Sequence, residues 1–254
     1  MYIRITKLSG PRASLALISA LLLSAAGCAS APPFQGMTAS DLHALGRTEY
    51  EAGNYGDAVE ALDHLLLLFP DYPQAAEARF LLAQAYVADE QFLEGADEYQ
   101  RFLDRHRGHL LAPDAALGVC RARAELSPIS QRDQTYTREA VTVCRNVTRD
   151  YEGDVATEAE AIANDLRAKL AQKEYENAEF YFNRGAFDSA ILYWEILVDE
   201  FGDTEWAPRA LLGIIRSYEE IGYQDLVEEY RQQLLNSYPD SEAANQLRVA
   251  GPVG

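Results

Sequence analysis

The chain has 254 residues, 48% hydrophobic and 24% charged, which suffices for one or two cores or for an elongated repeat array. Forty acidic residues against 22 basic ones give a formal net charge of −18. A chain of this charge is repelled overall by a phosphate backbone or an anionic membrane surface, so nucleic acid is excluded as its main partner.

The first residues differ in character from the rest of the chain. Arg4, Lys7 and Arg12 precede an apolar stretch over 15–26, and no acidic residue occurs before Asp41. This order is typical of a signal peptide. The apolar stretch is shorter than the roughly 20 residues that a spanning helix needs, so a transmembrane anchor is the less favoured interpretation.

The signal peptide ends in small residues that lead into a cysteine. Ala25-Ala26-Gly27-Cys28 resembles the lipobox of bacterial lipoproteins, although Ala25 stands where leucine is usual. The resemblance implies that Cys28 becomes the mature N-terminus and carries acyl chains that anchor the protein. Ala29 follows in place of the aspartate of inner-membrane lipoproteins, which predicts the periplasmic face of the outer membrane. Removal of residues 1–27 leaves 19 basic against 40 acidic residues, a net charge of −21.

The mature chain is predicted to be all-α. From Ser40 to Leu247 it is rich in Ala, Leu, Glu, Gln and Arg, and it has almost no alternating β-branched runs. A repeat is visible because a small residue recurs twelve positions before a helix stop. The pairs are Ala58 with Pro70, Gly95 with Arg107, Ala140 with Glu152, Ala190 with Gly202, and Val227 with Pro239.

These five units follow the tetratricopeptide pattern, in which a small side chain lets two helices cross closely. In three units a glycine five residues earlier, Gly53, Gly185 or Gly222, can adopt the left-handed conformation of a helix end. We therefore expect a right-handed solenoid of about five tetratricopeptide-like hairpins.

The third unit departs from regular spacing. Successive small positions are 37, 45, 50 and 37 residues apart, against about 34 in a plain array. The excess predicts a longer loop from Ser127 to Asp133 and one long helix from Thr157 to Arg184, because that stretch contains neither Gly nor Pro. The array should divide into two halves across this helix.

The predicted parts are a signal peptide (1–27), a flexible tether (28–39), units one and two (40–110), unit three (111–154), the long helix with units four and five (155–247), and a tail (248–254).

Two stretches resemble one family in particular. Arg132-Asp133-Gln134-Thr135 is similar to the third repeat, and Ala178-Glu179-Phe180-Tyr181 leading to Arg184-Gly185-Ala186-Phe187 is similar to the fourth repeat, of the outer-membrane assembly lipoprotein family BamD, formerly ComL. The resemblance covers essentially the whole mature chain. Departures are Arg107 in place of a proline stop, and Tyr193-Trp194 in the fourth repeat.

The resemblance implies a subunit of the machinery that folds β-barrel proteins into the outer membrane. Its N-terminal repeats would receive the C-terminal signal strand of unfolded barrel proteins. Its C-terminal repeats would dock on the membrane-proximal POTRA domain of a BamA-like barrel protein, beside other assembly-machinery lipoproteins. The alternative is another periplasmic repeat lipoprotein that coordinates Tol-Pal or peptidoglycan proteins. Those relatives usually carry a coiled coil before their repeats, and here only a short tether intervenes.

Candidate substrate-binding residues lie on the first helices of units one and two, which line the concave face of such arrays. They are Arg47, Tyr50, Phe80 and Gln84. A peptide ending in an aromatic residue and a carboxylate would suit a basic residue beside exposed rings. The competing interpretation is that Tyr50 and Phe80 are ordinary inter-repeat core.

Candidate partner-docking residues in the C-terminal half are Arg184, Tyr193 and Trp206, because Trp, Tyr and Arg are enriched in interface hot spots. Arg184 can equally cap the helix end before Gly185. Trp194 is expected in the core.

The remaining residues suggest no enzyme and no cofactor. Cys120 and Cys144 either form a disulfide in the oxidising periplasm or remain buried thiols, and no histidine lies nearby to complete a zinc site. His106 and His109 lack further ligands in phase, which disfavours a metal. Phosphate-binding, HExxH and GxSxG motifs do not occur.

Overall fold

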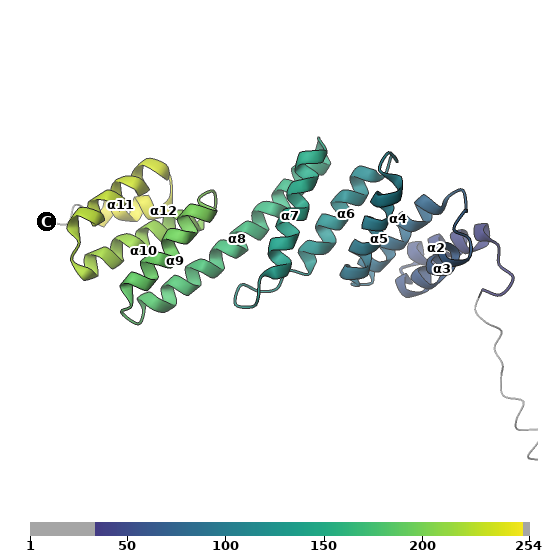
Figure 1. Ribbon diagram of the computed structural model, residues 1–254, viewed down its shortest axis with the longest axis horizontal. Helices are drawn as coiled ribbons and strands as arrows, with labels where there is room; N and C mark the ends of the chain where they lie inside the picture. The colour runs from purple at the N-terminus through teal and green to yellow at the C-terminus, as the bar shows by residue number, and fades with distance from the viewer. Residues whose placement is uncertain (1–33, 251–254) are drawn as a thin grey trace, which may run out of the picture.

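The computed structural model describes residues 34–250, and these form an elongated stack of helices (Figure 1). The predicted signal peptide, Cys28 and most of the tether lie outside the described residues. The helices are α2 (Ala39–Ala52), α3 (Tyr55–Leu68), α4 (Ala75–Ala88), α5 (Phe92–His106), α6 (Ala112–Glu125), α7 (Thr135–Asp150), α8 (Asp154–Phe182), α9 (Phe187–Phe201), α10 (Trp206–Ile221), α11 (Gln224–Ser237) and α12 (Glu242–Ala250).

Successive helices pair into five antiparallel hairpins, which confirms the predicted tetratricopeptide-like fold. The hairpins are α2 with α3, α4 with α5, α6 with α7, the end of α8 with α9, and α10 with α11, and α12 packs on the last of them. Figure 1 shows the turns inside hairpins along the lower edge and the connections between hairpins along the upper edge. All five small positions of the repeat are buried: Ala58, Gly95, Ala140, Ala190 and Val227.

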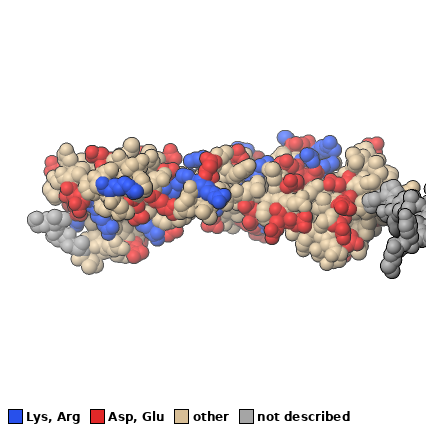
Figure 2. Space-filling model, turned by 90° about the horizontal axis from the view of Figure 1, so that it is seen from below, with Lys and Arg blue, Asp and Glu red and all other residues tan. Residues whose placement is uncertain are grey.

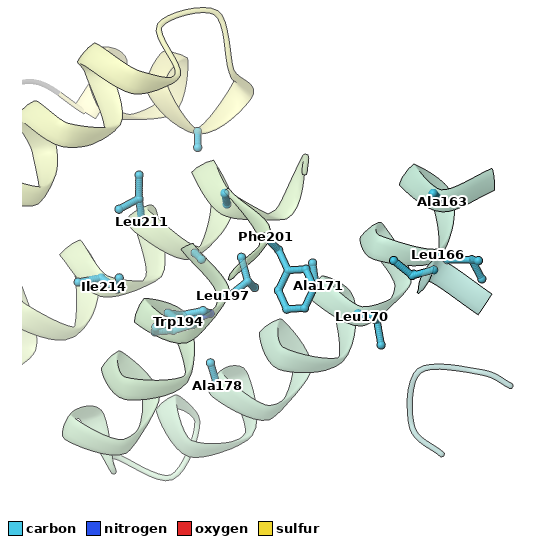
Figure 3. Packing of buried hydrophobic residues seen from close by; sticks show 14 of the residues in the cluster. Ala163, Leu166, Leu170, Ala171, Ala178, Trp194, Leu197, Phe201, Leu211 and Ile214 are labelled. Atoms are coloured by element: carbon cyan, nitrogen blue, oxygen red, sulfur yellow. The ribbon is translucent and has the colours of Figure 1, made fainter. Parts of the chain in front are cut away.

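Two helices of the array cross closely where one of them carries a glycine, because glycine has no side chain. Gly213 of α10 lies against the indole of Trp194 of α9, where a Cβ would come within 2.6 Å of the ring. Trp194 is 2% exposed, as expected for a core residue. Figure 3 shows it beside α10, with Ala178 of α8 facing it from the other side. The array therefore packs large against small at the hairpin contacts.

The long helix joins the two halves of the array and does not divide them. It starts at Asp154, after Gly153 with a φ of 73°, and ends at Phe182. Its contacts run to α6 and α7 on one side and to α9 and α10 on the other. One hydrophobic cluster therefore continues from Ala116 in α6 across α8 to Leu247 in α12. The expected division at this helix is absent from the core, because alanines and leucines recur on faces of α8 that meet both neighbours.

Unit three is held together by a covalent bond and by its loop. Cys120 of α6 and Cys144 of α7 are fully buried and joined in a disulfide, with their Cα atoms 4.8 Å apart. In the loop between these helices, the buried Gln134 amide donates to the carbonyl oxygens of Ile129 (2.8 Å) and Arg132 (3.1 Å). Gln134, which belongs to the stretch that resembles the third repeat of the BamD family, therefore closes this loop.

A partly buried ion pair ties α8 to the turn after α9. The Arg167 guanidinium donates to the Glu200 carbonyl oxygen (2.9 Å) and to the Asp203 carboxylate (3.1 Å), and it lies over the Phe201 ring. The hydrogen bond from Arg167 is the main reason why the pKa of Asp203 is lowered.

We expect Arg167→Ala to lower the free energy of unfolding by about 1–2 kcal/mol, a value reduced because Asp203 is half exposed. Since the folded pKa of Asp203 is lowered, this contribution is present above the unfolded carboxyl value of about 4 and is lost as pH falls through the lower folded value. Urea unfolding at neutral and acidic pH measures it. The control is Arg149→Ala, which removes the exposed pair with Asp150 and should change stability little. Equal losses for both variants would contradict the prediction.

The surface reflects the acidic composition. Figure 2 shows carboxylates spread along the whole length of one face, with arginine and lysine gathered in fewer places. Among residues 34–250, no helix combines the length and the apolar character that crossing a membrane requires.

Candidate functional site

The turn between α8 and α9 presents a cation and an exposed ring together. Arg184 follows the end of α8, and its guanidinium carbon lies 3.5 Å from the centre of the Phe180 ring. Its Nη1 also donates to the Phe180 carbonyl oxygen at 3.1 Å. Arg184 therefore caps the helix, as one of the two interpretations held, and at the same time covers a ring that is 50% exposed.

Two tyrosines extend this surface onto α9. The rings of Tyr181 and Tyr193 are stacked, with centres 5.2 Å apart and planes at 9°, and Phe180 meets Tyr181 edge-on at 5.4 Å. The pKa of Tyr193 is raised, chiefly by its hydrogen bond with Tyr181. Arg184, Phe180, Tyr181 and Tyr193 form a continuous row, which we call the aromatic ladder.

The exposed face of α9 continues the ladder with aliphatic side chains. Leu192 is 56% and Ile196 is 36% exposed, and they lie one helical turn apart. Neither residue was a candidate from the sequence, and neither was Phe180. The i,i+4 spacing of Phe180 and Arg184 on a predicted helix is the signal that could have found the ring.

Trp206, the third docking candidate, has a different setting. Its ring contacts Tyr175 of α8 at 5.3 Å, and the Arg209 guanidinium lies 4.8 Å from its centre. Tyr175 in turn contacts the core residue Trp194. Among the ring contacts of the described residues, Trp206 has none with the ladder, so it belongs to the packing between α8 and α10.

The four N-terminal candidates also differ in their surroundings. Arg47 is exposed on α2 and Gln84 is half-buried on α4. Tyr50 is half-buried against Tyr55, and its pKa is raised mainly by burial. The Phe80 ring contacts two buried residues of α5, Tyr99 at 5.4 Å and Phe102 at 5.8 Å. Phe80 is therefore engaged in packing inside its own hairpin, and Arg47 is the most accessible of the four.

Known proteins resemble this chain in sequence, and the matches identify its family. Residues 35–234 match the model of the YfiO family, described as outer membrane lipoprotein. The chain belongs to this family. Relatives of the family named outer membrane protein assembly factor BamD include one from Vibrio cholerae, 23% identical over 218 residues, which covers 81% of this chain and 90% of the relative. A putative BamD of Aquifex aeolicus is 26% identical over 226 residues, covering 83% and 73%. The resemblance to BamD is thereby confirmed, and the role of the chain lies in outer-membrane protein assembly.

Solved structures similar to this family member are other repeat proteins. A tetratricopeptide-repeat protein of Bacteroides fragilis is 13% identical, covers 84% of this chain and 99% of its own, and has a TM-score of 0.46. The TPR2AB domain of yeast Sti1, in complex with an Hsp90 peptide, is 12% identical, covers 81% and 80%, and has a TM-score of 0.44.

The buried charge of this BamD-family chain serves packing. Glu98 of α5 is 5% exposed and forms ion pairs with Arg79 of α4 and Arg101 of its own helix. This arrangement joins α4 to α5, in keeping with a protein that works through its surfaces.

Proposed function

We propose that this chain is the lipid-anchored scaffold subunit of the outer-membrane β-barrel assembly machinery, held at the periplasmic face of the outer membrane by acyl chains on Cys28. Through its C-terminal half it docks on the membrane-proximal POTRA domain of a BamA-like barrel protein. Through the concave face of units one and two it receives unfolded barrel proteins. Other lipoproteins of the machinery share the assembly.

The aromatic ladder is the observation that supports the docking role. A guanidinium stacked on a half-exposed ring and two stacked tyrosines lie in one row on an otherwise acidic chain, and Leu192 and Ile196 are exposed on the helix that carries Tyr193. Exposed apolar patches rimmed by polar residues mark protein interfaces, and arginine and aromatic side chains are the usual anchors.

Purification of the tagged, lipidated protein from its own membranes in detergent, followed by mass spectrometry, tests the proposal. We expect a POTRA-bearing barrel protein in nearly equal amount. Recovery of Tol-Pal or peptidoglycan-synthesis proteins without it would overturn the proposal in favour of an envelope coordinator.

The precursor-binding role predicts a measurable contribution from Arg47, which is exposed and makes no ion pair within residues 34–250. We expect Arg47→Ala to weaken binding of a peptide with a C-terminal aromatic residue roughly tenfold, the effect of one charge-assisted hydrogen bond. Fluorescence anisotropy of the labelled peptide measures this. Amidation of the peptide should weaken binding to the native chain by a similar factor and should not weaken binding to the variant further. An undiminished affinity of the amidated peptide for the native chain would contradict the prediction.

A further inference from the structure

Units one and two expose leucines at the edge where hairpins connect. Leu67 and Leu68, in the last turn of α3, are 77% and 54% exposed, and Leu110, in the connection from α5 to α6, is 89% exposed. The two connections are neighbours, because Pro70 after α3 and Arg105 and His109 near Leu110 line one cleft. Three exposed leucines therefore lie on one short edge of the molecule.

The structure holds Leu110 outward. The His109 ring packs edge-on against the buried Phe102 at 5.4 Å, and its Nδ1 accepts the Leu111 backbone N–H at 3.2 Å. Leu110 lies between His109 and Leu111, which these contacts hold, and its side chain is in solvent. A leucine kept in water forgoes about 1.5–3 kcal/mol of burial, so its presentation calls for an apolar environment elsewhere.

The charge of the α5–α6 side of this edge is opposite to that of the chain as a whole. Residues 101–111 contain three arginines and two histidines against one aspartate. Arg105 and Arg107 are exposed and make no ion pair among the described residues. The exposed side chains of helix α3 change from acidic to apolar toward this edge. Its earlier turns expose acidic side chains, and its last turn exposes Leu67 and Leu68. The acidic residues are Asp57, Glu60 and Asp63.

The distance to the lipid anchor identifies the occupant. Phe34, the first described residue, packs on His64 of α3 with ring centres 5.2 Å apart, and His64 lies one turn before Leu67 and Leu68. Phe34 is six positions after Cys28, and a fully extended chain covers at most about 22 Å in six residue steps. A lipid on Cys28 therefore keeps this end of the molecule close to the bilayer.

We propose that Leu67, Leu68, Arg105, Arg107 and Leu110, the seating edge, rest directly on the phospholipid surface that holds the Cys28 lipid. The leucines enter the interface between headgroups and acyl chains, and the arginines meet lipid phosphates. The net negative charge keeps the rest of the array off the surface. Seating would fix the orientation of the solenoid, because it adds contacts at positions distant from the lipid on Cys28. The inference rests on the proposed lipid anchor.

Lipid-borne quenching tests the contact. With Cys28 acylated and Cys120 bridged to Cys144, a cysteine introduced by Leu110→Cys is the only free thiol and takes an environment-sensitive fluorophore. The matched control is Ile129→Cys. Ile129 is 64% exposed in the loop between α6 and α7, and this loop lies on the opposite edge of the molecule (Figure 1). The lipidated full chain is reconstituted in vesicles of phosphatidylethanolamine with a minor share of phosphatidylglycerol, some of which carry a nitroxide on the acyl chain.

We expect the label at 110 to be quenched several-fold more than the label at 129, and Arg105→Glu with Arg107→Glu to reduce this difference. Equal quenching at the two positions in vesicle-bound protein would overturn the seating edge and leave the anchor intact. A chain that does not float with the vesicles would overturn the anchor instead. The same comparison is then made on the Cys28→Ser chain held on vesicles by an N-terminal histidine tag and a nickel-chelating lipid, where the introduced cysteine is again the only free thiol. Equal quenching there again overturns the seating edge, and stronger quenching at 110 supports it.

Discussion

Replacing Cys120 and Cys144 together by alanine is expected to lower the free energy of unfolding by about 3.5 kcal/mol. The bond closes a loop with a sequence separation of 24 residues, and the chain-entropy model assigns a loop of that length between about 3 and 4 kcal/mol. Among residues 34–250, the loop between α6 and α7 is the longest one inside a hairpin, and the crosslink spans it.

Urea unfolding of the mature chain with Cys28→Ser measures this contribution, with and without a reductant. Reduction of the native pair should shift the unfolding midpoint toward that of the double variant, and the double variant itself should not respond to reductant. A midpoint of the native pair that is insensitive to reduction would contradict the prediction. Because both sulfurs are buried, the reductant must be present before unfolding and be given time to act.

The fold could be predicted from the sequence to the level of single repeat positions. Small residues such as Ala58 and Ala190 mark helix crossings because only a small side chain fits there, and this constraint is visible in one sequence as a spacing. The predicted left-handed glycines are also confirmed, with φ of 82° at Gly53, 73° at Gly185 and 85° at Gly222. Local constraints of this kind require no knowledge of distant contacts.

Properties that depend on contacts between units could not be predicted in the same way. The sequence shows Phe80 and Tyr193 alike as aromatic residues on helix faces, and both are partly buried. Phe80 nevertheless contacts the buried rings of Tyr99 and Phe102, whereas Tyr193 stacks on the partly buried Tyr181. Which face of a helix meets its neighbour depends on the angle between hairpins. Continuity of the core through α8 escaped prediction for the same reason, and so did the helical state of residues 248–250, which α12 includes.

The structure joins the candidates Arg184 and Tyr193 through Phe180 and Tyr181 into the aromatic ladder, and its removal should have the largest effect on partner binding. Phe180→Ala with Tyr193→Ala takes away the half-exposed ring under Arg184 and the outer ring of the tyrosine stack. We expect the affinity for the POTRA-bearing partner to fall roughly 100-fold, about 3 kcal/mol, since truncated hot spots of this kind cost 2 kcal/mol or more each and are not additive. Titration of the purified partner by calorimetry measures the loss.

Two variants separate docking from folding in this experiment. Tyr223→Ala removes a ring that is 59% exposed at the corresponding turn of the next hairpin, and it should leave the affinity unchanged. Trp206→Ala should lower the unfolding midpoint clearly and the affinity only slightly, because the Trp206 ring packs on Tyr175 between α8 and α10. If Tyr223→Ala weakened binding as much as the ladder variant, the partner would be responding to exposed rings along the whole lower edge. Docking through the turn between α8 and α9 would then be ruled out as the specific contact.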